Sequence, residues 1–527
     1  MSDFAHVLVS RSDIARMAGV RRPAVTNWQR RHGDFPRPAG TGQESGEPDV
    51  FRAGEVLEWL SGRPVPSNAL LPEELPGATY GDRFRAALEG GGRRGGFRRA
   101  VERLARREAD ALRGRLSTAE FLYVLLHLVY VRSRQPQRWS VYVADPAAAM
   151  EHVDMPRAAE VPLDRLVGAL AGTPAPSQDE SRETFDLLLA LLQDADARTA
   201  AEFFTPVSVS RVMARALATH SASVKRVHDP YCRTGELLTG YLDAVAVRGA
   251  AAPQEVSGRA ASERALRLTR MNLVLRGVEH PDVWSGAWMP SLGPTDPPAA
   301  FDAVITNPPF ALRLDPSAAP QEYWRYGVPR SGDFDWLQYV VTRLAPDGHA
   351  AVLMASGAGF RGGAEERVRA RMVRDGVVAC VVALPPGLFA LTSISTHIWF
   401  LRAPRGCAEP ILFVDGGGLG TMASRTRREL TDDDIDVLVR AYTSWTVQGV
   451  IDPPELARAV EPEEIELHGF RLDPARYVRP DTLPSGPGDP AGARRRLRSL
   501  ADELEKLRGQ AESIDNTARR RLRRYGL

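Results

Sequence analysis

A strand end and a tight turn are predicted by the sequence Arg226-Val227-His228-Asp229-Pro230-Tyr231-Cys232-Arg233-Thr234-Gly235. The turn leads into a predicted helix over 236–247. A second buried strand is predicted by Phe301-Asp302-Ala303-Val304-Ile305-Thr306, and it ends in Asn307-Pro308-Pro309-Phe310. From about residue 201 onward, strands and helices alternate, which is typical of an open, mostly parallel sheet. Such sheets bind ligands at the carboxyl ends of their strands, so both turns are candidates for a ligand-binding edge.

The Asn-Pro-Pro-aromatic motif suits chemistry on an amine. Pro308 and Pro309 keep the backbone rigid and leave carbonyl groups free of helical pairing. The Asn307 amide oxygen and the Pro308 carbonyl can then accept both hydrogens of an exocyclic amine. Phe310 offers a face on which a flipped base can stack. The motif therefore predicts a catalytic site for the amine of a nucleobase.

Three motifs in this order resemble those of gamma-class DNA adenine-N6 methyltransferases: residues 201–206, 229–235 and 307–310. Over about residues 85–480 the chain resembles, more narrowly, the modification subunit of type I restriction-modification systems. The resemblance implies a Rossmann-like core that transfers a methyl group in line from S-adenosylmethionine to adenine N6 in DNA, without a covalent enzyme intermediate. The residues implied in cofactor binding are Phe204, Thr205, Pro206, Asp229, Thr234 and Gly235.

The cofactor motifs also depart from the family pattern. Arg233 stands at the first glycine of the usual Gly-Thr-Gly-Gly turn, and Glu236 stands at the last. Ala260 aligns with the acid that usually holds the ribose hydroxyls, and Ala287 aligns with an acid near the adenine ring. Two absent carboxylates, worth about 1–3 kcal/mol each, predict an affinity for S-adenosylmethionine that is about ten- to a thousandfold lower. Glu255, Glu263 and Asp282 are candidates to fill the vacated ribose position.

Three functions therefore stay open at the level of sequence. The first is an active adenine-N6 methyltransferase. The second is a catalytically impaired scaffold that keeps the fold and a base pocket but binds the donor weakly or not at all. The third is a ligand sensor that uses the same pocket to control the N-terminal domain. Binding of S-adenosylmethionine separates the first from the other two.

The N-terminus predicts a helix-turn-helix. Ser12 is expected to cap a helix over 13–18, Gly19 to supply the turn, and Pro23 to begin a second helix over 24–31. Phe51 and residues 56–60 are expected to form a wing strand and a closing helix, as in the winged helices of excisionase and MerR-type regulators. The residues expected to form the small core are Ile14, Ala15, Val20, Val25 and Trp28.

The second helix would present groove-reading side chains to double-stranded DNA. A generic helical hairpin or a protein-binding module are the alternatives. The residues expected to face DNA are Arg21, Arg22, Thr26, Asn27, Gln29 and Arg30.

The domain order expected from the sequence begins with a winged helix and ends with a coiled coil. Proline and glycine mark the first linker, helical periodicity marks the next domain, and leucines at 3-4 spacing in the tail support a coiled coil. A single amphipathic helix packed on its own domain is the alternative for the tail. The expected domains are 1–62 (winged helix), 63–96 (linker), 97–196 (all-helical), 197–420 (methyltransferase-like α/β core), 421–490 (C-terminal extension) and 491–527 (coiled-coil helix).

Charge and family resemblance together predict the partners. The chain has a formal net charge of +2, yet residues 1–40, 93–115 and 492–527 are each strongly basic, which suits contact with a polyanion. The resemblance implies a specificity subunit and a nuclease subunit as partners, and a role in host defence. The tail is a candidate for docking a specificity subunit or for self-association.

Composition limits the setting of the chain. Hydrophobic residues make up 43% and charged residues 25%, as in a folded soluble protein. The longest apolar run, 121–131, is too short for a membrane helix, and the N-terminus lacks a secretory pattern. Cys232, Cys380 and Cys407 have neither metal-site nor disulfide spacing. A cytoplasmic protein without a metal site is therefore expected.

Overall fold

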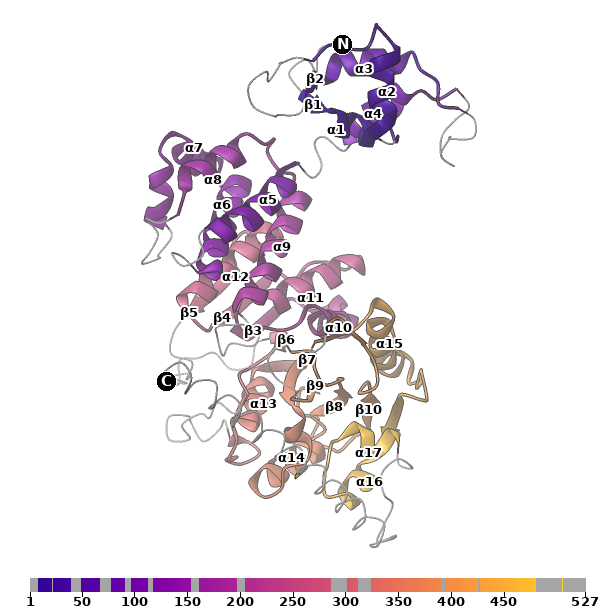
Figure 1. Ribbon diagram of the computed structural model, residues 1–527. Coiled ribbons are helices and arrows are strands. Elements are labelled where there is room, and N and C mark those ends of the chain that lie inside the picture. The colour runs from indigo at the N-terminus through magenta and orange to yellow at the C-terminus, as the bar shows by residue number, and fades with distance from the viewer. Residues whose placement is uncertain are drawn as a thin grey trace. The chain divides into compact units, whose positions relative to one another are not determined.

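The computed structural model describes residues 8–20, 22–38, 49–66, 77–90, 96–111, 117–152, 161–196, 204–285, 301–310, 324–389, 394–424, 427–479 and 505. These fall into two compact units. The first comprises Met1–Ser210 with Ser221–Trp288, and the second comprises Arg211–His220 with Met289–Leu527. Helical elements dominate the first unit, and most of the strands belong to the second (Figure 1).

The N-terminal domain packs four helices with a two-stranded ribbon. Its elements are β1 (Leu8–Ser10), α1 (Arg11–Met17), α2 (Arg22–Arg31), β2 (Val50–Arg52), α3 (Ala53–Ser61) and α4 (Tyr80–Gly90). The strands β1 and β2 pair antiparallel, and Gly19 makes the turn between α1 and α2 with a φ of 68°. The expected core residues lie together: Ile14, Ala15 and Val25 are buried, and Val20 and Trp28 pack against them.

Two details of this domain differ from expectation. The cap of α1 is Ser10 rather than Ser12, because the Asp13 N–H donates to Ser10 Oγ at 3.2 Å. Residues 80–90, expected within the 63–96 linker, form α4 instead. Phe84 of this helix is fully buried in the same core as Phe51, so for these residues the linker prediction is wrong. The prolines and glycines on both sides of α4 obscured its apolar face.

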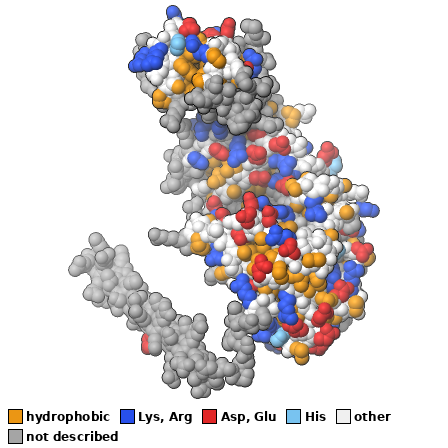
Figure 2. Space-filling model, turned by 90° about the vertical axis from the view of Figure 1, so that its right-hand side faces the viewer, with side chains coloured by type: hydrophobic (Ala, Val, Ile, Leu, Met, Phe, Trp, Pro, Cys, Tyr) orange, Lys and Arg blue, Asp and Glu red, His pale blue; other side chains and the backbone are white. Residues whose placement is uncertain are grey.

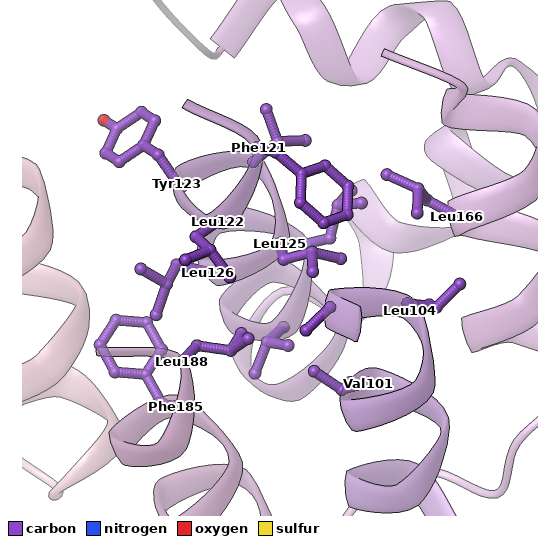
Figure 3. Packing of buried hydrophobic residues seen from close by; sticks show 14 of the residues in the cluster. Val101, Leu104, Phe121, Leu122, Tyr123, Leu125, Leu126, Leu166, Phe185 and Leu188 are labelled. Atoms are coloured by element: carbon purple, nitrogen blue, oxygen red, sulfur yellow. The ribbon is translucent and has the colours of Figure 1, made fainter. Parts of the chain in front are cut away.

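The helical domain is built around one buried helix. Its elements are α5 (Gly96–Ala111), α6 (Thr118–Arg134), α7 (Pro136–Ala144), η2 (Pro146–His152), α8 (Leu163–Ala171) and α9 (Gln178–Asp196). Figure 3 shows side chains of α6 such as Leu125 and Leu126 among residues of α5, α8 and α9. The apolar run over 121–131 therefore lies at the centre of a hydrophobic core. Among the described residues, no helix is long and apolar enough to cross a membrane.

The first unit also holds three strands and the helices that follow them. The helix α10 (Val207–Leu217) and the short η4 (Ala218–Ser223) precede β3 in the chain, and Arg211–His220 of these elements belong to the second unit. The strands β3 (Arg226–Cys232), β4 (Glu255–Ala260) and β5 (Asp282–Ser285) pair in parallel, in that order. The helix α11 (Glu236–Val247) follows β3, and α12 (Glu263–Leu275) follows β4. The predicted strand, turn and helix over 226–247 are thus confirmed.

The second unit contains the remaining sheet strands in the order β13-β10-β8-β9-β7-β6. The strand β6 (Phe301–Thr306) pairs in parallel with β7 (Leu344–Ala355), and β8 (Val378–Ala383) with β10 (Ile411–Asp415). The strands β9 (Thr396–Arg402) and β13 (Ala457–Val460) run antiparallel to their neighbours. The remaining elements are α13 (Gly332–Arg343), η6 (Ser356–Gly359), α14 (Ala364–Arg374), β11 (Thr421–Met422), β12 (Arg428–Glu429), α15 (Asp432–Gln448), α16 (Pro462–Leu467) and α17 (Pro474–Val478).

The predicted fold class, α/β with a mostly parallel sheet and substantial helical content, is confirmed. The strand β6 ends at Thr306, directly before the Asn-Pro-Pro motif, as its sequence predicts. The expected coiled-coil helix over 491–527 lies outside the described residues, apart from Glu505.

Candidate functional site

The turn after β3 requires glycine at its last position. Gly235 has a φ of 76° and a ψ of 15°, in the left-handed region, and it caps the start of α11. A Cβ atom added there would lie 3.0 Å from Thr269 Cγ2 and 3.3 Å from Thr269 Cα. Both the backbone conformation and the close approach of α12 therefore disfavour a larger residue.

Asp229 lies just before this turn and is buried, with 2% of its surface exposed. Its Oδ1 accepts a hydrogen bond from the Tyr231 N–H at 2.9 Å. Cys232 is fully buried beside it, and burial raises the pKa of the thiol well above its usual value. A Cβ at Gly258 would come within 2.5 Å of Cys232 Sγ, so the cysteine is a packing residue that the neighbouring glycine accommodates.

Arg233, which replaces a glycine of the family pattern, is buried against the turn. Its guanidinium carbon lies 5.0 Å from the centroid of the Tyr231 ring, within cation–π distance. Only 6% of the residue is exposed. The extra bulk that the sequence predicted at this position is thus packed on a neighbouring aromatic ring.

Glu236, the second departure, turns its carboxylate back onto the motifs predicted to bind the cofactor. Its Oε2 accepts from the Thr234 hydroxyl at 2.8 Å and from the Thr234 N–H at 3.2 Å. Its Oε1 accepts from the Thr205 N–H at 3.4 Å. Because Glu236 is the first residue of α11, its charge also lies at the positive end of that helix. The structure therefore brings Thr205, Thr234 and Gly235 together around a carboxylate of the chain itself.

The turn is supported by Asn272 of α12 and by Arg276, which directly follows that helix. The buried Asn272 donates through Nδ2 to the Thr234 carbonyl at 2.9 Å. Arg276 donates to Asn272 Oδ1 at 2.5 Å, and it also pairs with Asp186 and Asp243. Neither Asn272 nor Arg276 was singled out from the sequence. The signal was present: an Asn and an Arg four residues apart on an otherwise apolar helix face.

Of the three acids considered for the vacated ribose position, one lies at the appropriate edge. Ala260 ends β4 and is buried. Glu255 and Asp282 begin β4 and β5, so they lie at the opposite ends of those strands. Glu263 begins α12, three residues beyond Ala260, and its carboxylate accepts a hydrogen bond from Ser285, the last residue of β5. Ala287 lies outside the described residues.

The second unit carries the amine-binding motif at the carboxyl end of β6. Asn307 follows this strand directly and only 2% of it is exposed. Pro308 is buried as well, whereas Pro309 and Phe310 are half-buried. The Asn307 side chain is thus held by its surroundings, and Phe310 remains partly exposed.

A buried histidine lies at the start of β9, in register with Met354 of β7 and Ala383 of β8. His397 is 4% exposed, and burial lowers its pKa to about 4. It is therefore neutral at neutral pH. This residue was not singled out from the sequence, because a single histidine in an apolar strand has no distinguishing pattern.

The motifs and the fold can now be compared with known proteins. A family model described as N-6 DNA Methylase matches residues 177–484, more than half of the chain. The chain belongs to this family. The match begins just before α9 and ends beyond α17, so it includes both candidate motifs.

Curated relatives give the same assignment. The chain is 28% identical over 315 residues to the type I restriction enzyme HindI methylase subunit of Haemophilus influenzae, covering 57% of this chain and 69% of that one. It is 26% identical over 360 residues to the type I restriction enzyme MjaIX methylase subunit of Methanocaldococcus jannaschii, covering 63% and 62%. The resemblance to type I methylase subunits is thus confirmed.

Solved structures share the fold of this chain. One is the type I restriction-modification methyltransferase subunit from Streptococcus thermophilus, with a TM-score of 0.61 and 20% identity over 72% of this chain and 99% of that one. Another comes from a structural study of assembly and conformational transition in a type I restriction-modification system. It has a TM-score of 0.55 and 19% identity over 79% and 97% of the two chains.

The N-terminal domain lies outside the 177–484 match. Of its predicted DNA-facing residues, Thr26, Asn27 and Arg30 are exposed on α2. Gln29 is partly buried, and its Oε1 accepts from Arg11 Nε at 2.8 Å. The predicted Arg21 and the side chain of Arg22 lie outside the described residues. Figure 2 shows basic side chains exposed on this domain, at the top of the view.

Proposed function

We propose that this chain is the modification subunit of a type I restriction-modification system and methylates adenine N6 in double-stranded DNA. The observation that carries the proposal is the placement of Asn307 and Pro308. Both are buried at the carboxyl end of the parallel strand β6, followed by the half-buried Phe310. A held amide oxygen next to a proline carbonyl is suited to orient a primary amine.

The amine half of the reaction follows from these residues. The Asn307 amide oxygen and the Pro308 carbonyl accept the two N6 hydrogens of an adenine that has left the base stack, and Phe310 stacks on its ring. Two hydrogen bonds in the plane of the amine direct the nitrogen lone pair out of that plane, toward the methyl group. Pro309 keeps the segment rigid, so the orientation is set before the base arrives.

The donor half suits S-adenosylmethionine in charge. Asp229 places a buried carboxylate just before the turn after β3, which is favourable for a sulfonium cation. When bound, the donor supplies an electrophilic methyl group. The residues that would hold it are Phe204, Thr205, Pro206, Asp229, Thr234 and Gly235, with Glu263 near the vacated ribose position. Loss of the acids at Ala260 and Ala287 implies weakened binding of this donor.

The partners follow from charge and family. We propose that the exposed Thr26, Asn27 and Arg30 contact DNA through the N-terminal domain, within the cytoplasm. A specificity subunit would select the target sequence, and a nuclease subunit would complete a defence system. The residues 491–527 would dock the specificity subunit or a second copy of the chain.

The experiment uses the full chain, affinity-tagged and purified from its native host together with its partners. Incubation with duplex DNA and S-adenosylmethionine carrying a labelled methyl group should give N6-methyladenine in the DNA. The Asn307→Ala variant should retain DNA binding and transfer no label, because the amine loses its main acceptor. Equal transfer by the variant and the wild type would refute the assigned role of Asn307.

A second candidate function is favoured by the turn itself. Ala260 in place of an acid, together with a Glu236 carboxylate bound to Thr205 and Thr234, suits a scaffold that keeps the base pocket but binds the donor poorly. A sensor that controls the N-terminal domain would use the same pocket. DNA binding without any label transfer at saturating donor would favour these functions over methylation.

A further inference from the structure

Glu236 occupies the hydrogen-bond donors that its own turn presents. Three donors converge on its carboxylate: the Thr205 N–H, the Thr234 N–H and the Thr234 hydroxyl. They come from two separate segments, one before α10 and one between β3 and α11. Both segments belong to the motifs implied in cofactor binding, so a side chain of the protein takes donors that were expected to serve a ligand.

The chemistry of these donors identifies the part of the ligand that would compete. Backbone N–H groups at the start of a helix favour an anion. In S-adenosylmethionine the one anionic group is the carboxylate of the amino-acid tail, while the sulfonium and the ammonium are cations. A carboxylate within the chain binds these donors without losing the translational freedom that a ligand loses. Its charge also repels a second carboxylate brought nearby.

We infer that Glu236 is a specificity-determining residue that disfavours the tail carboxylate of the donor. The site would therefore prefer an adenosyl sulfonium that keeps its ammonium but lacks the carboxylate. The inference rests on the donor site named in the proposed function, and it concerns binding rather than turnover.

Two ligands that differ only in the carboxylate isolate this effect. Isothermal titration of the full chain with S-adenosylmethionine and with its decarboxylated form gives a ratio of affinities for each variant. Glu236→Gln keeps the size and an acceptor oxygen but removes the charge, and Glu236→Gly also removes the side chain, as in the family turn. The matched control is Glu255→Gln, which removes one exposed charge at the start of β4.

The wild-type chain should bind decarboxylated S-adenosylmethionine more tightly than S-adenosylmethionine. Glu236→Gln should strengthen binding of S-adenosylmethionine by about tenfold, and Glu236→Gly by about ten- to a hundredfold, the range of a charge-assisted hydrogen bond. The decarboxylated ligand should change by less than about threefold, because it lacks the competing group. Glu255→Gln should change neither affinity. Retained far-ultraviolet circular dichroism shows that the variants fold.

Other outcomes overturn the inference. If the Glu236 variants bound both ligands more weakly than the wild type, and by the same factor, Glu236 would bind the ammonium group instead. The inference would also be refuted if the ratio of the affinities for the two ligands were the same in the wild type and the Glu236 variants, or if no variant bound either ligand. Failure of the proposed function is a separate result, because a chain that transfers no methyl group can still show the predicted ratio. Conversely, methyl transfer with an unchanged ratio would refute the inference alone.

Discussion

Substitution of Gly235 by alanine should destabilise the turn for two separable reasons. The φ of 76° places an L-residue in the left-handed region, at a cost of about 1–2 kcal/mol. The new Cβ would also lie 3.0 Å from Thr269 Cγ2 and 3.3 Å from its Cα, and overpacking of this kind costs about 1–3 kcal/mol. The expected loss in the free energy of unfolding is therefore about 2–5 kcal/mol.

Gly249 provides a matched control in the same unit. Its φ is 67°, and no atom lies within 4 Å of the Cβ that alanine would add. Gly249→Ala should thus cost only the backbone part, about 1–2 kcal/mol. The difference between the two variants measures the contact with Thr269.

Thr269→Ser identifies the atom responsible. Serine removes Cγ2 but keeps the hydroxyl, so in the Gly235→Ala background it should recover about 1 kcal/mol relative to the sum of the single effects. Urea unfolding of the four proteins gives the coupling energy. Equal costs for the Gly235 and Gly249 variants, or no coupling between Gly235→Ala and Thr269→Ser, would refute the packing described for this turn.

Three further predictions concern other parts of the chain. Between pH 6.5 and about 4, His397 is protonated in the unfolded state but neutral in the folded state. The free energy of unfolding should therefore decrease by up to about 3 kcal/mol as the pH falls from 6.5 to about 4. The neutral His397→Gln variant should show a flatter pH profile of unfolding, and an identical profile would count against the buried neutral state. Asn272→Ala should destabilise the first unit by about 1–3 kcal/mol in urea, because the Thr234 carbonyl and Arg276 each lose a partner, whereas an unchanged midpoint would contradict their pairing. Arg30→Ala should weaken DNA binding and reduce the slope of affinity against salt by about one in fluorescence anisotropy titrations, and an unaltered slope would exclude a phosphate contact.

Local patterns made the core of the fold predictable. The strand over 226–232, its glycine turn and the helix from Glu236 are set by neighbouring residues, so their bounds follow from the sequence alone. The same is true of β6 and the motif that follows it. Parallel sheets bind ligands at the carboxyl ends of their strands. The candidate catalytic residues could therefore be predicted, because they directly follow the carboxyl end of β6.

Contacts between distant residues were not predictable in the same way. The bond from Thr205 to Glu236 joins segments 31 residues apart, and that from Asn272 to Thr234 joins segments 38 apart. The sequence showed Glu236 only as a departure from a glycine pattern, with no indication of where its carboxylate would turn. The helix α4 was missed because its packing partner, the core around Phe51, is distant in sequence.

The most direct test of the account is a map of N6-methyladenine in the genomic DNA of the native host. Cells with the wild-type chain should carry the modified base at one recurring sequence, and cells with Asn307→Ala should lose it at those sites. An unchanged methylation pattern in the Asn307→Ala cells would contradict the central claim that this residue orients adenine for methylation.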